Sequence, residues 1–399
     1  MRISYTEEQE KLRRQLREYF SGLMTPERRE AIVNSPQGEY GDGAAFKEVV
    51  RQMGRDGWLA IGWPTEYGGQ ARPNMDQLIF NDEAAIAGAP IPFLTVNTAA
   101  PALMAGGTTE QKAFYLPKIA QGELHFSIGY SEPEAGTDLA SLRTRAVRDG
   151  DEYVINGQKM WTSLIEYADY VWLAARTDPE ATKHRGLSVF IVPTQVDGKP
   201  TEGFSWTKVH TVAGPGTSAT YYSDVRVPAA NLVGEEHKGW ALITNQLNHE
   251  RVALTSAAPL QESLRQVRDW AQREKLPDGS RVIDSEWVQM HLARVHAHVE
   301  YLKLRNWKIA WAADSSKLGP AEASATKVFG TEFATEAYRL LMEVLGTGAI
   351  VRKGSPHELL SGRIERLHRA ALILTFGGGT NEVQRDLVAA TALGLPVTR

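Results

Sequence analysis

Hydrophobic and polar positions follow a helical period at both ends of the chain and a strand period in the middle. Near the N-terminus, Leu12, Leu16 and Phe20 share one face of an expected helix, which opens with the capping-box pair Thr6 and Gln9. Further helical segments, separated by turns rich in Gly and Pro, continue to about residue 123. Short segments rich in β-branched and aromatic residues then predict strands up to about residue 232.

The helical period returns after the strands and lasts to the end of the chain. One segment with an apolar face runs from Trp240 to Arg273, further segments follow, and a closing helix begins after Thr380. Several long helices with apolar faces indicate a bundle. The pattern therefore predicts an α+β fold, mainly α, with a helical domain at 1–123, a β domain at 124–232 and a helical bundle at 233–399.

Composition and charge exclude several classes of protein. The 399 residues suffice for about two or three domains, and 42% hydrophobic with 23% charged residues is ordinary for a globular protein. A formal net charge of −4 lacks the basic excess expected of a nucleic-acid binder. No apolar run approaches the roughly 18 residues of a membrane span, and the Glu-rich N-terminus lacks the apolar segment of a signal peptide. We therefore expect a cytoplasmic protein that binds no nucleic acid and has no membrane span.

Residues able to bind metals or act as nucleophiles are few. The absence of cysteine excludes disulfides, thiolate metal sites and a cysteine nucleophile. The ten histidines show no cluster at metal-ligand spacing, so we expect no metal. Glu132 and Asp138, which lie in a turn at the start of the β domain, are expected to brace that turn rather than to act in catalysis.

The stretch FGGGTNEVQR, at residues 376–385, raises the first question of function. Three consecutive glycines before Thr380 suggest a phosphate-binding loop, but a P-loop needs a following Lys, and a Rossmann loop needs a preceding strand. Neither context is present. A turn between two helices, capped by Thr380 or Asn381, is the simplest interpretation. The exposed N-terminus of the closing helix can in addition hold a pyrophosphate.

Two stretches of the β domain complete a more specific pattern. YSEPEAGTD covers residues 130–138, QKMWTS covers residues 158–163, and both precede a bundle that ends in GTNEVQR. This combination resembles the acyl-CoA dehydrogenase family of flavoproteins over nearly the whole chain. The resemblance implies an N-terminal helical domain, a central β-barrel and a C-terminal four-helix bundle.

The resemblance also implies an FAD cofactor bound against the β domain. A flavin carries the hydride chemistry, while the protein supplies orientation and hydrogen bonds to the ring nitrogens. Thr137 matches a family serine near the acyl-CoA. The positions that match flavin-binding positions of the family are Ile128, Tyr130, Ser131, Trp161, Ser163, Thr380 and Glu382.

The reaction implied by the resemblance removes an α-proton from an acyl thioester and passes a β-hydride to the flavin, so it needs a carboxylate base. Many members carry this glutamate directly before the Gly-Thr of the C-terminal motif, where this chain has Gly378. Isovaleryl-CoA dehydrogenase and similar members carry it on the first bundle helix, before an Arg, where this chain reads Glu250-Arg251. A lone Glu beside an Arg on a helix is usually a solvated surface pair. The missing carboxylate at Gly378 nevertheless favours Glu250 as the base.

The same glycines bear on the substrate. Without side chains, residues 377–379 leave room for a bulky or branched acyl group. We expect Gly377, Gly378 and Arg251 beside the substrate, together with Thr137. The size of a steroid is compatible with this glycine run, although the run does not by itself require a steroid.

The chain departs from the family pattern where the adenosine half of FAD is held, which is a task of the neighbouring subunit in that family. The stretch LPDGSRV at residues 276–282 lacks the family's R-x-x-F-G pattern, and Glu343 stands where a Gln is expected. A glutamate facing the pyrophosphate would be electrostatically unfavourable. Either Arg281 or another cation compensates, or a non-identical partner subunit supplies the adenosine-binding residues. We favour the second interpretation.

The chain is most similar in these motifs to the base-bearing subunit of the heterotetrameric acyl-CoA dehydrogenases of actinobacterial steroid catabolism. The resemblance implies an α2β2 assembly that converts the CoA thioester of a sterol side chain, in cholesterol catabolism, to a trans-2-enoyl-CoA. It further implies an electron-transferring flavoprotein as the electron acceptor. Two alternatives stay open, a non-catalytic subunit kept for assembly and a flavoenzyme similar to acyl-CoA oxidases.

Overall fold

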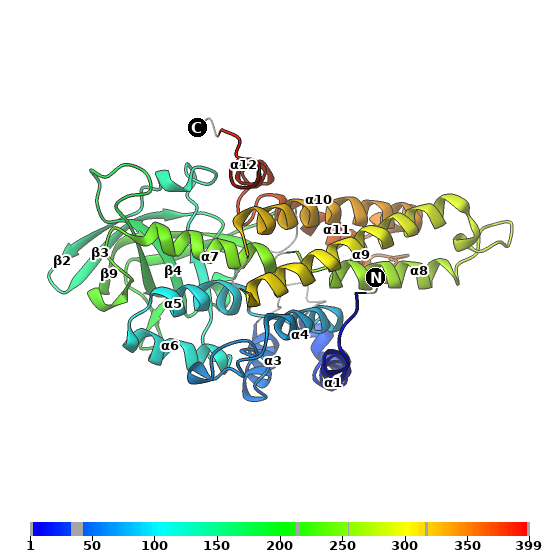
Figure 1. Cartoon of the computed structure of the whole chain (residues 1–399), viewed down its shortest axis with the longest axis horizontal. Coiled ribbons are helices and arrows are strands. Elements are labelled where there is room, and N and C mark those ends of the chain that lie inside the picture. The colour runs from blue at the N-terminus through cyan, green and yellow to red at the C-terminus, as the bar shows by residue number, and fades with distance from the viewer. Residues whose placement is uncertain (1–2, 33–42, 213–215, 254, 316–317, 397–399) are drawn as a thin grey trace.

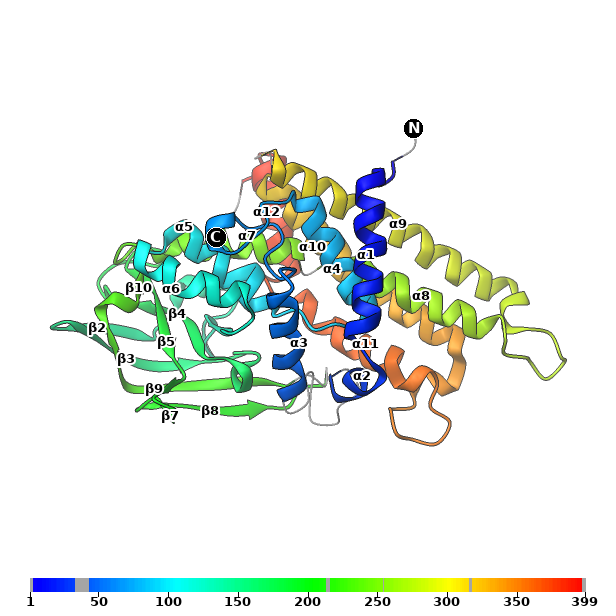
Figure 2. The ribbon, with the colours of Figure 1, turned by 90° about the horizontal axis from the view of Figure 1, so that it is seen from below.

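The computed structural model describes residues 3–32, 43–212, 216–253, 255–315 and 318–396, without the side chains of residues 248–253. Figure 1 shows an elongated molecule, with the strands at one end and the long helices at the other. The N-terminal helices lie along one side of both (Figures 1 and 2). Within the described residues, no helix is both long enough and apolar enough to cross a lipid bilayer.

The N-terminal part is helical, as predicted. Its helices are α1 (Glu7–Leu23), α2 (Pro26–Ile32), α3 (Ala44–Arg55), α4 (Asn74–Ala87), α5 (Ala100–Gly106) and α6 (Thr109–Ala120), with a π-helical turn, η2 (Thr95–Ala99), before α5. Thr6 accepts a hydrogen bond from the Gln9 N–H, and the Gln9 side chain accepts one from the Thr6 N–H, which confirms the predicted capping box. Buried Glu83 of α4 then accepts from Arg13 and Arg17, at 3.1 and 2.8 Å, so α1 is fixed across α4.

The middle of the chain forms an eight-stranded sheet and a small two-stranded hairpin, β6 with β7. The strands are β1 (Phe126–Gly129), β2 (Arg145–Asp149), β3 (Glu152–Lys159), β4 (Tyr170–Arg176), β5 (Leu187–Pro193), β6 (Gln195–Val196), β7 (Lys199–Pro200), β8 (Phe204–Val209), β9 (Thr217–Pro228) and β10 (Leu232–Val233). The order in the large sheet is β10-β5-β4-β2-β3-β9-β8, and β1 pairs with β4 in parallel. The predicted β domain is therefore confirmed. Its core contains Tyr153, Phe190 and Tyr222.

The C-terminal part is again helical and contains the two longest helices of the described chain. Its helices are α7 (Gly239–Ala253), α8 (Ala258–Ala271), α9 (Glu286–Asp314), α10 (Pro320–Leu345), α11 (Arg363–Ala371) and α12 (Asn381–Ala392). Val295, Phe333 and Leu341 belong to the apolar core that α8, α9 and α10 share. The predicted domain boundary at 123/124 falls between α6 and β1, whereas the one at 232/233 passes through β10.

The segment expected to be one helix from Trp240 to Arg273 is broken, so this prediction was wrong. Helix α7 ends at Ala253 and α8 begins at Ala258, with Pro259 in its first turn. Proline lacks a backbone N–H and its ring collides with the preceding turn, so it is tolerated at the start of a helix but not inside one. Asn306 of α9 holds the break: its side chain donates to the Thr255 carbonyl at 3.0 Å and accepts from the Ala257 N–H at 3.2 Å.

Helix α7 is the element that joins the parts of the molecule. It contacts β5 of the sheet, α5 and η2 of the N-terminal part, and α10 of the bundle. In Figure 1 it runs from the strands toward the long helices. Helix α7 therefore connects the sheet, the N-terminal helices and the bundle.

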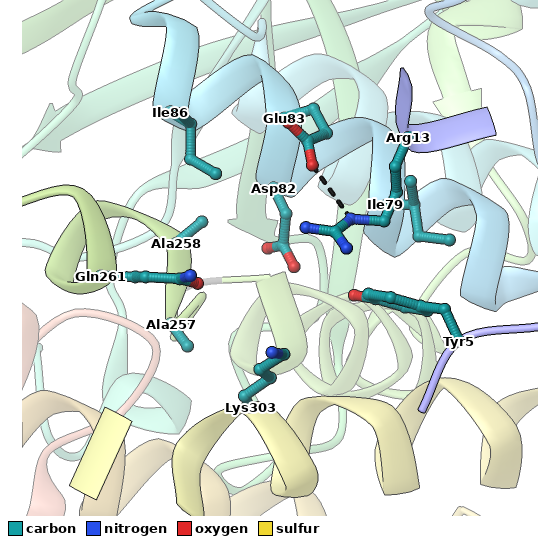
Figure 3. Close-up of a pocket in the computed structure, with 10 residues that line it drawn as sticks. All are labelled: Tyr5, Arg13, Ile79, Asp82, Glu83, Ile86, Ala257, Ala258, Gln261 and Lys303. Carbon is teal, nitrogen blue, oxygen red and sulfur yellow. Dashed lines mark hydrogen bonds and ion pairs between the residues drawn. The ribbon is translucent and has the colours of Figure 1, made fainter. Parts of the chain in front are cut away.

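A polar pocket lies beside the α7–α8 break and contains an unusual carboxylate (Figure 3). Asp82 of α4 points into it and accepts a hydrogen bond from Ser256 at 2.7 Å. The Tyr5 hydroxyl and the Lys303 ammonium point toward the same space. Burial raises the pKa of Asp82 to about 6, although the Ser256 hydrogen bond acts in the opposite direction.

We expect Asp82→Asn to stabilise the protein at neutral pH. The folded state raises the pKa of this carboxyl above its unfolded value, so folding favours the protonated form and ionised Asp82 destabilises the fold above about pH 6. The amide removes that penalty and keeps an oxygen for Ser256. The gain in unfolding free energy, measured by urea denaturation, should be present at about pH 7.5 and vanish toward about pH 4.

The matched control is Asp151→Asn, which changes an exposed aspartate in the turn between β2 and β3. Its stability should follow that of the unmodified protein across the same pH range. A loss of stability in Asp82→Asn at neutral pH would show that the charged form is needed at the break.

Candidate active site

Two segments of the β domain that are distant in sequence lie side by side. One is the end of β1 with the residues after it, and the other is the loop that follows β3. The Ser131 carbonyl accepts from the Met160 N–H at 2.8 Å, and the Ser127 hydroxyl donates to the Ser163 carbonyl at 2.9 Å. The structure therefore brings together the predicted flavin-ring residues Ile128, Tyr130, Ser131, Trp161 and Ser163.

The 160–163 loop has a conformation that regular strands do not use. Trp161 has φ of 66° and its side chain is 53% exposed, which is uncommon for a tryptophan. Leu164 also has positive φ, at 62°. Such strain persists only where surrounding contacts hold it, and it is frequent at functional sites. Here the Thr162 N–H donates to the Ser218 carbonyl at 2.9 Å, and Ser163 shares a hydrogen bond with Thr217 at 3.1 Å.

A buried ion pair supports both segments from behind. Lys159, the last residue of β3, is fully buried and donates to the Tyr130 carbonyl and to the Glu132 carboxylate, each at 2.9 Å. Glu132 also accepts from the backbone N–H groups of Arg143 and Thr144, at 2.7 and 2.8 Å. Glu132 thus braces the turn, in agreement with its expected structural role.

The charge state of this pair follows from burial and from its hydrogen bonds. Burial lowers the pKa of Lys159 to about 8, because the low-dielectric interior disfavours the ammonium, and Glu132 opposes that shift. Burial alone would raise the pKa of Glu132, but the Lys159 charge and the hydrogen bonds from Thr144, Lys159 and Arg143 lower it overall. Both groups are therefore charged at neutral pH.

The glycine run forms a turn between α11 and α12. Gly378 has φ of 70° and Gly379 has φ of 89°, a region that L side chains rarely adopt. The backbone at these two positions therefore favours glycine. Thr380 caps α12 by accepting from the Val383 N–H at 3.4 Å, as one of the predicted alternatives had it, and Glu382 is exposed in the first turn.

A second buried lysine holds this turn. Lys327 of α10 is fully buried and donates to the Gly379 carbonyl and to the Asn381 side chain, each at 2.8 Å, and more weakly to the Thr375 carbonyl at 3.3 Å. Asn381 in turn donates to Thr331 of α10 at 3.1 Å. The turn at Gly377 and Gly378 is thereby fixed to α10, which also contacts α7.

The proposed base lies on α7, but its side chain is outside the described residues. The backbone of α7 extends to Ala253, so Glu250 and Arg251 belong to its last turn. The backbone of α7 contacts β5 of the sheet and α10 of the bundle.

Thr137 is exposed in the turn that follows Ser131 and Glu132. The neighbouring Asp138 accepts from the Ser141 hydroxyl at 2.6 Å and from Lys183 at 3.2 Å. These hydrogen bonds, the Ser141 one first, lower the pKa of Asp138. Asp138 thus braces its turn, as expected, and links it to the loop between β4 and β5.

The region expected to meet the adenosine half of FAD is occupied by internal ion pairs. Glu343 accepts from His291 at 2.6 Å and pairs with Arg339. Arg281 makes a two-point pair with Asp284, at 3.0 and 2.7 Å. The alternative in which Arg281 compensates for Glu343 is weakened, because the carboxylate of Asp284 already binds this guanidinium.

The residues of the two β-domain segments fit a flavin ring. Such a ring needs a flat surface and hydrogen-bond partners along its edges. The exposed indole of Trp161 would provide the surface, and the hydroxyls of Ser131 and Ser163 would provide partners. Ser218, whose carbonyl binds the loop, has a buried hydroxyl without a partner among the described residues. Among all the residues that the structure describes, no group of acidic and histidine side chains is arranged to hold a metal ion.

Sequence reasoning did not assign roles to Lys159, Lys327 or Gln246, which is buried on α7. The sequence did contain a signal for the two lysines. Each lies at a position where the repeat of buried residues along its strand or helix predicts a core residue. A charged residue at such a position is almost never fully buried unless it is paired. The partners themselves come from distant segments, so the pattern could not identify them.

Comparison with known proteins gives matches along the whole chain. Sequence models of the acyl-CoA dehydrogenase family match as its N-terminal domain at residues 6–123, its middle domain at residues 127–225 and its C-terminal domain at residues 237–393. The chain is 70% identical to "Acyl-CoA dehydrogenase FadE26" of Mycobacterium tuberculosis, with 99% of each chain covered.

Two solved structures are similar over the full length. One is described as the ChsE4-ChsE5 complex from Mycobacterium tuberculosis, with 68% identity, a TM-score of 0.91 and 100% of both chains covered. The other is described as the Tcur3481-Tcur3483 steroid ACAD, with 48% identity, a TM-score of 0.90 and 100% of both chains covered. At these identities, the likeness extends beyond the shared fold.

We expect Lys159→Met to destabilise the protein strongly. Removing one partner of a buried ion pair leaves the other charge uncompensated, which lowers the unfolding free energy by about 3–5 kcal/mol. Urea denaturation of the purified variant measures this loss. A change below about 1 kcal/mol would mean that Glu132 is held by its backbone donors alone.

Arg226→Met is the matched control, because Arg226 pairs with Asp149 and Glu152 at 2.8 and 2.9 Å on the surface. Solvent screens such pairs, so this variant should lose no more than about 1 kcal/mol. The difference between the two variants isolates the effect of burial.

Proposed function

Because the chain belongs to the acyl-CoA dehydrogenase family, we propose that it carries out the FAD-dependent α,β-dehydrogenation of a sterol side-chain CoA thioester, giving a trans-2-enoyl-CoA. The observation that carries this proposal is the likeness over the whole chain to a solved complex described as a steroid acyl-CoA dehydrogenase, "steroid ACAD". Family membership supplies the reaction class, and this likeness supplies the substrate class. We further propose that the enzyme acts in the side-chain stage of cholesterol catabolism.

We propose Glu250 as the base that removes the α-proton. The turn that carries a glutamate in many family members has Gly378 here, with φ of 70°, so a carboxylate is absent from it. The position of Glu250 lies in the last turn of α7, the helix that contacts both the sheet and the bundle. A carboxylate there would belong to the helix that contacts both β5 and α10, and α10 also holds the glycine turn.

Bound FAD would supply the acceptor for the β-hydride. Ile128, Tyr130, Ser131, Trp161 and Ser163 would orient its ring, and Thr380 with Glu382 would meet it at the start of α12. The chain's own contribution is to hold these segments rigid, through Lys159 on one side and Lys327 on the other. Pre-organised groups of this kind act without reorganisation when the reaction occurs.

The substrate would lie along the same boundary. Gly377 and Gly378 leave space for a bulky acyl group, Arg251 follows the base on α7, and Thr137 would meet the CoA part. Lys183 lies beside the Thr137 turn through its bond to Asp138, at 3.2 Å.

We further propose that a non-identical partner subunit completes the FAD site, in an α2β2 assembly. Support comes from the ion pairs of Glu343 and Arg281, which leave these two residues unsuited to a pyrophosphate. The similar chain in the ChsE4-ChsE5 structure is part of a two-component complex. An electron-transferring flavoprotein is the proposed electron acceptor, as in the family generally.

We expect Glu250→Gln to keep bound flavin but to lower turnover by about 10²–10⁴-fold, since a positioned base contributes that much. Turnover is measured in the complex co-expressed with the partner subunit, as flavin bleaching and enoyl-CoA formation with a sterol side-chain CoA thioester. Glu286→Gln, at the exposed start of α9, is the control and should turn over normally. Near-normal turnover in Glu250→Gln would contradict the proposed base and would favour a non-catalytic subunit.

The chain purified alone should be folded but colourless, and co-expression with a second subunit should restore flavin at about half a molecule per polypeptide. The absorption spectrum and a count of FAD per chain measure this. About one FAD per chain in the isolated protein would contradict the split site. Rapid reoxidation of the reduced enzyme in air would instead indicate an acyl-CoA oxidase.

A further inference from the structure

We propose that Tyr130 and Gln246 form a positioning pair that fixes helix α7, and with it the base, relative to the segment that lines the flavin. The pair joins the two sides of the site: Tyr130 follows β1, and Gln246 lies on α7. The Tyr130 hydroxyl donates to the Gln246 carbonyl oxygen in a short hydrogen bond. This inference rests on the proposed function, because it concerns the placement of Glu250.

Tyr130 is rigid, so it can act as a reference point. Its carbonyl accepts from Lys159 at 2.9 Å, which ties its backbone to the buried ion pair. Its hydroxyl accepts from the indole N–H of Trp172 at 3.1 Å, and Trp172 is fully buried in β4. Both the backbone and the side chain of Tyr130 are thus held by groups of the β domain.

Gln246 transmits this position to α7. It is fully buried and lies one helical turn before Glu250, so the two positions share one face of the helix. A hydrogen bond at Gln246 restrains both the rotation of α7 about its axis and its shift along that axis. A misplacement of about 1 Å in a catalytic group can reduce the rate by about 10²-fold, so restraint of this kind matters for turnover.

Stability alone does not explain a glutamine at this position. Its side-chain N–H₂ group is buried and has no hydrogen-bond partner in the described structure, which is unfavourable for folding. The surroundings are apolar, since Tyr130, Trp172 and Ile243 belong to one hydrophobic cluster. An apolar side chain of similar volume would stabilise such a site at least as well, so the amide is kept for its bond to Tyr130.

Gln111 of α6 shows what a structural glutamine looks like in the same molecule. It is also buried, but its amide donates to the carbonyls of Ala230 and Leu232, each at 2.8 Å, and accepts from the Thr108 N–H at 3.0 Å. Every hydrogen-bonding group of this amide is used. Gln111 is therefore a matched control for Gln246.

The test compares Gln246→Met, Tyr130→Phe and the double variant in flavin-loaded enzyme, purified with its partner subunit. Each variant should keep its flavin content while kcat falls by about tenfold to 10²-fold, and Gln246→Met should also keep its Tm. Tyr130→Phe should lower Tm, because it also leaves the buried Trp172 indole N–H without its acceptor. The double variant should fall no further than Tyr130→Phe alone, because that change already removes the bond to Gln246. A sterol side-chain CoA thioester deuterated at the α-carbon should show an increased isotope effect, since proton abstraction becomes slower.

Two control variants define the opposite behaviour. Gln111→Met should lower Tm and leave kcat unchanged, because its amide only stabilises the fold. Tyr153→Phe removes another buried tyrosine hydroxyl, which donates to Glu236 at 2.7 Å, and should likewise leave kcat unchanged.

Three results would each overturn the positioning pair. They are an unchanged kcat in Gln246→Met, additive losses of kcat in the double variant, and a fall in the Tm of Gln246→Met as large as that of Gln111→Met. Glu250→Gln, measured in parallel, separates this result from a failure of the proposed base. If Glu250→Gln turns over normally, the proposed function fails, whatever the other variants do.

Discussion

The contact of helix α7 with the β sheet is the constraint on which the rest of the site depends. The proposed flavin-lining residues and the proposed base belong to different parts of the chain, and this contact helps to set the distance between them. The hydrogen bond from Tyr130 to Gln246 is its polar component, and the apolar cluster that includes Trp172 and Ile243 surrounds it. Packed interiors resist deformation, so such a contact defines the geometry of a reacting site closely.

Buried charges hold the polypeptide around this contact. Lys159 fixes the segment after β1, Lys327 fixes the glycine turn, and Glu83 fixes α1 across α4. Each binds several oxygens or guanidinium groups from distant segments, which compensates for the loss of hydration. A hydrophobic side chain could fill the same space but could not fix backbone carbonyls at defined positions. The charged side chains are thus explained by orientation rather than by stability.

The region around Glu343 and Arg281 differs from the proposed active site in how its charged groups are paired. Glu343, His291 and Arg339 satisfy one another, as do Arg281 and Asp284. A surface that binds a pyrophosphate needs cations with free hydrogen-bonding capacity. This region is therefore organised as a stable surface, whereas strain is retained at Trp161 and Leu164, in the proposed flavin-binding loop.

The sequence by itself determined the order of helical, strand and helical parts, the capping box of α1 and the family, because period and short motifs are local properties. It also indicated the missing carboxylate at Gly378 and the loss of the adenosine-binding pattern. It did not predict the break between α7 and α8, which depends on Pro259 together with Asn306 from another helix. Only the tertiary structure decided which residues support the site. The bonds of Lys159, Lys327 and Gln246 join segments far apart in the chain, and such pairings leave no period in the sequence.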